Sequence, residues 1–241
     1  MSSLAHAESH AAFISYPKQA AFGRTLPKNK IYEHSGANTR LKDLFVEQVE
    51  QIVWQYKLAP ETINLPAKAG VPELQIFSIQ LKTPELHLDV LRCIDGAVQF
   101  PIIFELSYES HTKVIAAYKR PNESDASRWV LSDYFATTWL PSDCERSAMP
   151  VALDLGSLYE KTLHRLIPTP VRPQESLAEF VARFELIAAK QREVERAASK
   201  LSKEKQFNRK VELNAELRKL RSDLERLRDK QGTRRDSGGE Y

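Results

Sequence analysis

The chain has few of the residues that most recognisable catalytic and metal sites require. Of its 241 residues, only eight are glycine and six are histidine. The glycines form neither GxGxxG nor GxxxxGK[ST], and no HExxH or GxSxG segment occurs. The dinucleotide-binding, P-loop, zinc-hydrolase and esterase classes therefore lose their main support. The histidines lack metal-ligand spacing. No cofactor or metal is expected, and the sequence favours a protein that is not an enzyme.

Cysteine and long apolar runs are also scarce. Cys93 and Cys144 are the two cysteines, lie far apart and form no CxxC, which predicts reduced thiols in a cytoplasmic protein. No apolar run approaches the roughly 18 to 20 residues that cross a bilayer. The N-terminal segment lacks the basic start and apolar block of a secretory signal. We therefore expect a cytoplasmic protein without membrane contact.

Charge is distributed unevenly along the chain. Residues 190–235 contain 16 Lys and Arg against 8 Asp and Glu, whereas residues 1–189 contain 19 against 22. The formal net charge of +3 therefore conceals a basic C-terminal segment. Such a segment attracts polyanions, but a solvated helix rich in Lys, Arg and Glu has the same composition.

The apolar pattern of residues 31–167 predicts an α+β domain. Helices are predicted over residues 39–58, from 83 to about 98, and over 156–167. Strands are predicted over residues 74–81, 100–108, 113–120 and 129–140. The short connection ESHT favours an antiparallel hairpin, so the sheet is expected to be mostly antiparallel with helices packed on one side.

The two ends of the chain differ from this domain. Residues 1–30 are expected to be loosely structured. The proline-rich stretch PTPVRPQE, residues 168–175, predicts a stiff linker, followed by a coiled-coil-like helical arm over 176–230 and a disordered tail over 231–241. An unbroken arm would be on the order of 80 Å long. Its apolar seam must therefore be covered, either by a hairpin return or by another chain, including a second copy.

A change of helical register inside the arm is the principal candidate site. The apolar positions before EKQFNRKVELNAELRKL are out of register with those after it, and Asn208 and Asn214 flank the change. Buried asparagines in coiled coils select register and partner, which favours a docking site. The candidate partner- or nucleic-acid-binding residues are Phe207, Asn208, Arg209, Lys210, Asn214, Arg218 and Arg221. The alternatives are a phosphate-binding groove and an ordinary solvated face, in which Arg209 and Lys219 pair with Glu212 and Glu216.

The best catalytic alternative is a metal-dependent nuclease. Asp95, Glu105 and Lys119 have the residue types that such a site uses. However, Glu105 is followed by Leu106 and Ser107, so the acid-x-lysine step is missing. Lys57 offers an anion site in principle, but a structural role for this helix-end lysine and its neighbours is favoured.

Several segments together resemble the bacterial domain-of-unknown-function family 4391. They are WQYKLAPETINLPA, VPELQIFSIQLK, LRCIDGAVQFPIIFEL, VIAAYKR, TTWLP and KEKQFNRKVELNAELRKL. The likeness spans roughly residues 15 to 230. The positions that carry it are Trp54, Lys57, Leu58, Thr62, Asn64, Ile94, Asp95, Tyr118, Lys119, Thr138, Trp139, Phe207, Asn208, Val211, Asn214 and Leu217.

This resemblance implies a particular set of neighbouring genes but no known activity. Members are typically encoded beside helicases and DNA methyltransferases of restriction-like, phage-defence clusters. The resulting hypothesis is a non-enzymatic accessory or adaptor subunit that docks through its C-terminal arm. Its expected partner is the DNA helicase or methyltransferase of the same gene cluster. Nucleic-acid binding through the basic arm and metal-dependent nuclease activity are the two alternatives.

Overall fold

The computed structural model describes residues 11–122, 124–125, 128–167 and 169–228. The chain divides into two compact units, residues 1–168 and 169–241. The boundary falls at the start of the interval 168–175 that the sequence suggests as a linker. The predicted tail 231–241 lies outside the described residues.

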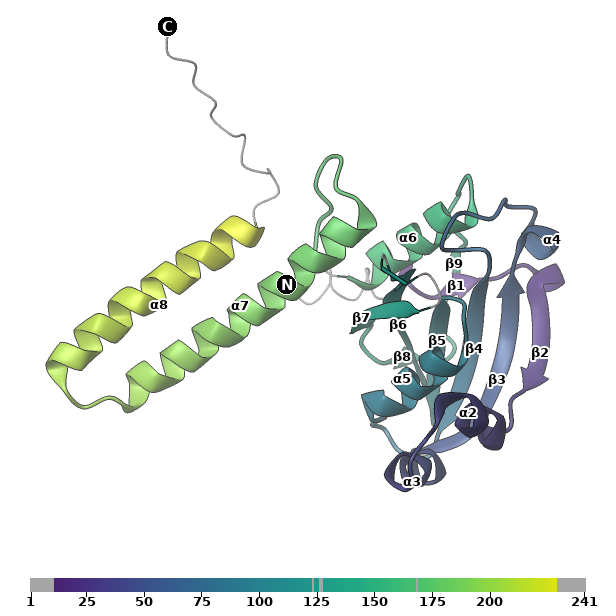
Figure 1. The fold of residues 1–241 in the computed structure, drawn as a ribbon, viewed down its shortest axis with the longest axis horizontal. Helices are drawn as coiled ribbons and strands as arrows, with labels where there is room; N and C mark the ends of the chain where they lie inside the picture. Colours follow the sequence, from purple (N-terminus) through teal and green to yellow (C-terminus); the bar gives the residue numbers. More distant parts are fainter. Residues whose placement is uncertain (1–10, 123, 126–127, 168, 229–241) are drawn as a thin grey trace, which may run out of the picture. The chain divides into compact units, whose positions relative to one another are not determined.

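The first unit is built on a mixed sheet of seven strands in its described part (Figure 1). In sheet order these are β2 (Ala21–Thr25), β3 (Val49–Leu58), β4 (Leu74–Leu81), β5 (Ile102–Tyr108), β6 (His111–Pro121) and β7 (Trp129–Ala136), with β8 (Leu140–Pro141) also paired to β6. The β4–β5 pair is parallel and the other pairs are antiparallel. The predicted α+β class, the strand at 74–81 and the β5–β6 hairpin are confirmed.

One face of the sheet holds a large apolar core. Helices α2 (Lys28–Ser35), α3 (Thr39–Gln48) and α5 (Leu88–Ala97) contribute Ile31, Phe45 and Ile94 to it. The strands contribute Phe77 and Phe104, whose rings meet edge to face at 6.1 Å. The core follows the predicted apolar alternation of β4, because alternate side chains of a strand point to the same face.

The opposite face of the sheet is covered as well. Glu105 follows Phe104 on β5, so its side chain points away from this core. It binds Arg146, which also donates to the carbonyl oxygen of Ile14. Arg165 of α6 (Leu155–Leu166) in turn donates to the carbonyl oxygen of Ala148. The expectation that helices pack on one side of the sheet is therefore wrong, because α6 and the small parallel pair β1 (Ile14–Ser15) and β9 (Ser147–Ala148) lie on the second face.

The predicted helix 39–58 is helical only in its first half. Asn38 caps α3 by accepting a hydrogen bond of 2.9 Å from the backbone N–H of Leu41, but the helix ends at Gln48. Residues 49–58 form β3, which pairs with both β2 and β4. This stretch is rich in β-branched and aromatic residues, and pairing on two sides satisfies its backbone groups as well as a helix would. The short α4 (Pro60–Ile63) begins just after β3, with Pro60 in its first turn.

The N-terminal part is more ordered than the sequence suggests. Residues 11–30, expected to be loosely structured, contain β1, a 3-10 turn at Lys18–Ala20, β2 and the start of α2. Lys28 holds this segment to the rest of the unit by donating to the carbonyl oxygens of Phe45 and Val49, at 2.9 and 2.5 Å. These long-range contacts have no local sequence signal.

In its described part the second unit contains two helices, α7 (Leu177–Lys203) and α8 (Phe207–Arg228), which lie side by side and antiparallel (Figure 1). Their common seam contains Ile187, Val194, Ala197, Leu217 and Leu224, with Ala198, Leu201, Leu220 and Leu227 packed against it. The arm therefore folds back on itself, one of the two solutions left open by the sequence. Among the described residues, no helix is apolar over a length sufficient for a membrane crossing.

Candidate functional site

The register change in the arm is the turn of this hairpin. Residues 204–206 are not helical, and the carboxylate of Glu204 accepts hydrogen bonds from the backbone N–H groups of Lys205 and Gln206 at 2.7 and 2.9 Å. These bonds lower the pKa of Glu204, and the bond from Gln206 has the larger effect. The two apolar runs are out of register because they belong to two helices that face each other.

The predicted site residues all lie on the exposed surface of α8. Phe207 and Val211 keep 78% and 54% of their surface exposed, although neighbouring leucines of α8 are buried in the seam. Asn208 and Asn214 are exposed as well. They are therefore absent from the α7–α8 seam and do not select its register. Their role in docking stays a prediction. Their side chains are available to solvent or to another molecule.

The basic members of the set differ in their partners. Arg209 lies 2.5 Å from Glu212, an exposed pair of the kind expected for a solvated helix. Among the residues that the structure describes, Lys210, Arg218 and Arg221 make no ion pair. The exposed face of α8 thus combines two apolar side chains near the turn with three cations that form no ion pair within the described residues.

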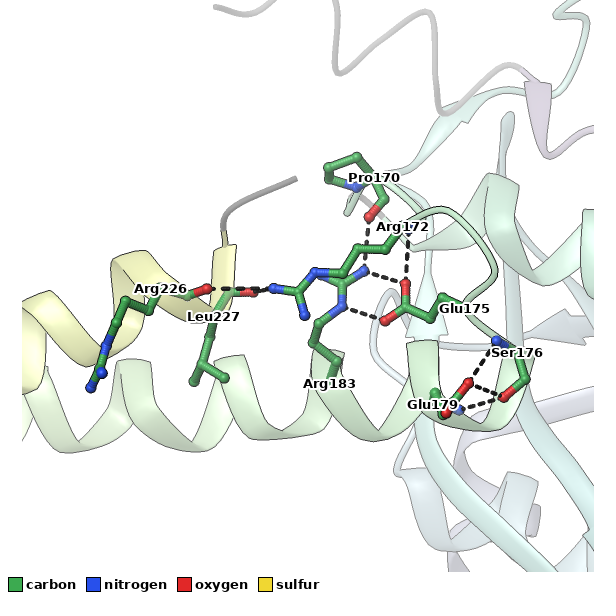
Figure 2. Close-up of polar contacts among 8 residues, drawn as sticks. All are labelled: Pro170, Arg172, Glu175, Ser176, Glu179, Arg183, Arg226 and Leu227. Carbon is green, nitrogen blue, oxygen red and sulfur yellow. Dashed lines mark hydrogen bonds and ion pairs between the residues drawn. The ribbon is translucent and has the colours of Figure 1, made fainter. Parts of the chain in front are cut away.

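A buried ionic cluster clasps the other end of the hairpin (Figure 2). Arg183 of α7 binds both carboxylate oxygens of Glu175, at 2.6 and 2.7 Å, and donates to the carbonyl oxygen of Pro170. The two charged side chains are only 6% and 8% exposed. Arg172 donates to the carbonyl oxygens of Arg226 and Leu227, which belong to the last turn of α8. The segment that precedes α7 therefore binds both helices and links the start of α7 to the end of α8.

The candidate nuclease residues do not meet at one site. Lys119 and Asp95 face each other on the α5 side of the sheet, with Nζ and Oδ1 3.7 Å apart. Glu105 lies on the opposite face and is held by both terminal nitrogens of Arg146, at 2.9 and 2.8 Å. No group of three His, Cys, Asp or Glu that could hold a metal ion occurs among the described residues.

The Asp95–Lys119 pair joins α5 to β6. The Lys119 ammonium group donates to the carbonyl oxygens of Asp95 and Val98, which would otherwise be unsatisfied at the end of α5. Tyr134 donates to the second carboxylate oxygen of Asp95 at 2.5 Å. The side chains of Lys119 and Asp95 are only 1% and 2% exposed. A fully buried pair that caps a helix has a structural role, because no substrate reaches it.

The stability of the first unit should depend on pH through Asp95. Burial raises the pKa of this carboxyl group from 3.8 to about 6, although Lys119 and Tyr134 act in the opposite direction. Between about pH 4 and pH 6 the folded state therefore retains a proton that the unfolded chain has released, so the free energy of unfolding falls as the pH rises. Wild type should lose on the order of 2 kcal/mol relative to Asp95→Asn across this window.

This dependence is measured by urea unfolding of both proteins at several pH values, followed by tryptophan fluorescence. The three tryptophans, Trp54, Trp129 and Trp139, all belong to the first unit. Parallel profiles for wild type and Asp95→Asn between pH 4 and pH 6 would contradict the assignment to Asp95.

Lys57 and its neighbours have structural partners, as favoured from the sequence. Lys57 lies on β3, 2.7 Å from Glu61 and 3.4 Å from Glu73. Thr62 donates to the carbonyl oxygen of Lys57, and Asn64 takes the left-handed conformation with φ 53°. The Lys57 ammonium group is thus already paired with carboxylates, which argues against an anion-binding site at this residue.

Two exposed aliphatic residues of the first unit had no sequence signal. Val151 and Leu153, in the loop before α6, are 87% and 86% exposed. Lys161 donates to the carbonyl oxygen of Val151 at 2.7 Å, and the N–H of Leu153 donates to Ser157. The loop is therefore held in place while its aliphatic side chains face solvent. A prediction from hydropathy would place aliphatic residues such as these in a core.

A family model described as Domain of unknown function (DUF4391) matches residues 14–224. The chain belongs to this family. The resemblance noted in the sequence is confirmed, and the DUF4391 match runs from β1 into α8. The hairpin is thus part of the family domain and not an appendage to it. No curated protein and no solved structure matches the chain.

Proposed function

We propose that this DUF4391 protein is a cytoplasmic, non-enzymatic accessory subunit that docks through the exposed face of α8. The observation that carries the proposal is the exposure of Phe207 and Val211, 78% and 54%, on a helix whose seam leucines are already covered. Because α7 covers that seam, the proposal rests on the exposed face of α8 and not on the seam. An aromatic anchor on a preorganised helix is typical of binding hot spots, since little conformational entropy is lost on association.

The kind of partner follows from the family. DUF4391 proteins are expected beside helicases and DNA methyltransferases, so the proposed partner is the helicase or methyltransferase of the same gene cluster. In this role the α+β unit and the hairpin are parts of one adaptor. The adaptor would belong to a restriction-like defence system.

Nucleic-acid binding by the same face is the second candidate. Lys210, Arg218 and Arg221 favour it, because none of them forms an ion pair with a carboxylate within the described chain. Phosphate neutralisation would make the affinity fall steeply with salt. The exposed Phe207 and Val211 favour a protein partner over a phosphate backbone, which offers no apolar surface.

The docking proposal is tested by co-purification of the full-length chain with the helicase and the methyltransferase of its cluster. The double variant Phe207→Ser/Val211→Ser should reduce recovery of one partner at least tenfold, because loss of an anchoring aromatic typically costs about 2 kcal/mol or more. Its helical circular dichroism should stay at the wild-type value, since both side chains are exposed.

Val46→Ser is the matched control. Val46 lies on α3 and is 58% exposed, close to the 54% of Val211. It should leave recovery unchanged. Equal recovery of both partners by wild type and the α8 variant, or recovery of neither by wild type, would count against the docking role.

A further inference from the structure

Helix α8 carries two stripes of the same spacing. The buried seam uses Leu213, Leu217, Leu220, Leu224 and Leu227, separated by four, three, four and three residues. The exposed residues Phe207, Val211, Asn214, Arg218 and Arg221 repeat this spacing. At 3.6 residues per turn, the two stripes lie about 120° apart around the helix axis. A four–three repeat is the pattern by which one helix packs along another. We name the exposed set the second stripe.

The second stripe changes in chemistry along its length. It begins with two apolar residues, Phe207 and Val211, next to the hairpin turn. Arg218 and Arg221 follow after Asn214, and Lys210 flanks the stripe. The first carboxylate in register is Glu225, one step beyond Arg221. From the turn to Arg221 the stripe is therefore apolar, then polar, then basic.

This charge pattern disfavours a second copy as the occupant. A parallel two-fold dimer through the second stripe would bring the cations of the two chains together. An antiparallel one would place the arginines of each chain opposite the apolar half of the other, where they meet no carboxylate. Like charges across a helix interface are destabilising. Asn214 at the centre is of the type that selects partner and register at a cost in stability. The stripe thus requires an occupant with negative charge.

We propose that the second stripe binds one amphipathic helix of a partner protein, with apolar residues packed on Phe207 and Val211 and acidic residues facing Arg218 and Arg221. This inference rests on the proposed docking role of α8 and adds the chemistry of the partner. The helix of the partner would pack along α8 alone, on a face about 120° around the helix axis from α7.

Designed peptides of about three heptads test this chemistry on the full-length chain. The acidic probe carries leucine at its first a and d positions and glutamate at the remaining ones. A second probe has glutamine and a third has lysine in place of glutamate. Each is made in both orders of its apolar and charged halves, because the stripe does not define the direction of the bound helix. Binding is measured by fluorescence anisotropy.

The acidic probe should bind wild type roughly tenfold or more tightly than the glutamine probe. The double variant Arg218→Glu/Arg221→Glu should lose this preference and select the lysine probe. Lys219→Glu makes a charge reversal of the same kind next to Arg218 on an exposed position outside the stripe. It should keep the wild-type preference, and all variants should keep the helical circular dichroism of wild type.

Three results would overturn the inference. They are equal binding of the acidic and glutamine probes in both orders, competition of duplex DNA with the probe that is lost in the same double variant, and a dimer that dissociates on Phe207→Ser/Val211→Ser. If a cluster protein still requires Phe207 and Val211 while the acidic probe has no advantage, the chemistry fails and the docking role stands. If the acidic probe binds but neither cluster protein does, the proposed partner fails instead.

Discussion

Replacing Lys119 by methionine is expected to destabilise the first unit by about 3 to 5 kcal/mol. The substitution keeps most of the apolar length of the side chain but removes the ammonium group, which leaves the Asp95 carboxylate buried without its counter-charge. The carbonyl oxygens of Asp95 and Val98 also lose their donor. Small domains have a total stability of only about 5 to 15 kcal/mol, so this loss would bring the unit near unfolding.

A double-mutant cycle separates the interaction between Asp95 and Lys119 from the other effects of replacing Lys119. Asp95→Asn/Lys119→Met should be more stable than Lys119→Met by about 2 kcal/mol, because the uncompensated charge is gone. The measurement is urea unfolding followed by tryptophan fluorescence at pH 7. Lys113→Met is the control: Lys113 is on the same strand, its ammonium group lies 5.7 Å from the Trp139 ring, and no ion pair is broken. Equal losses for Lys113→Met and Lys119→Met would contradict a special role of the buried pair.

Replacing Arg183 by methionine is expected to melt the hairpin at a much lower temperature. Glu175 would remain nearly buried, at 8% side-chain exposure, without the guanidinium group that binds both its oxygens. Removing one partner of such a pair typically costs about 3 to 5 kcal/mol. The hairpin has a short apolar seam, so this cost is a large part of its stability. In addition, the carbonyl oxygen of Pro170 loses its donor.

The two units can be followed separately in this experiment. Helical circular dichroism reports on both units, since α7 and α8 supply about half of the helical residues, whereas tryptophan fluorescence reports on the first unit alone. Arg183→Met should lower the melting temperature of the part of the helical signal that does not follow fluorescence, and leave the fluorescence transition unchanged. Arg209→Met is the matched control, since it breaks an ion pair whose side chains are 59% and 64% exposed. Exposed pairs of this kind contribute about 0 to 1 kcal/mol. If the helical transitions of Arg183→Met and Arg209→Met coincided, the buried Arg183–Glu175 pair would not stabilise the hairpin as proposed.

The period of the apolar residues predicted those helices and strands for which only one period, helical or extended, fits the sequence. The strand Leu74–Leu81 carries Phe77, Ile79 and Leu81 on one face and pairs with a strand on each side, and its bounds match the prediction. The stretch 39–58 failed for the opposite reason. Its apolar positions satisfy both a helical and a strand period, and only pairing with β2 and β4 decides for a strand after Gln48.

The phase change in the sequence drew attention to Phe207, Asn208 and Asn214. They were expected to lie where the arm bends or switches partner. The structure places a turn there and leaves these residues exposed. The buried carboxylate partners of Arg146 and Arg183 were missed, because a glutamate that will pair inside the fold has the same appearance in a sequence as one that faces solvent.

The sequence by itself determined the α+β class, the family, the basic C-terminal segment and the presence of two amphipathic runs. These follow from composition, short motifs and the periods of apolar residues, which are local properties of the chain. Only the tertiary structure decided that the two runs cover each other, that Asp95 and Lys119 form a buried pair, and that Glu105 lies on the other face of the sheet. The physical reason is that burial and ion pairing depend on which distant residues meet in space, and local periods do not encode those meetings.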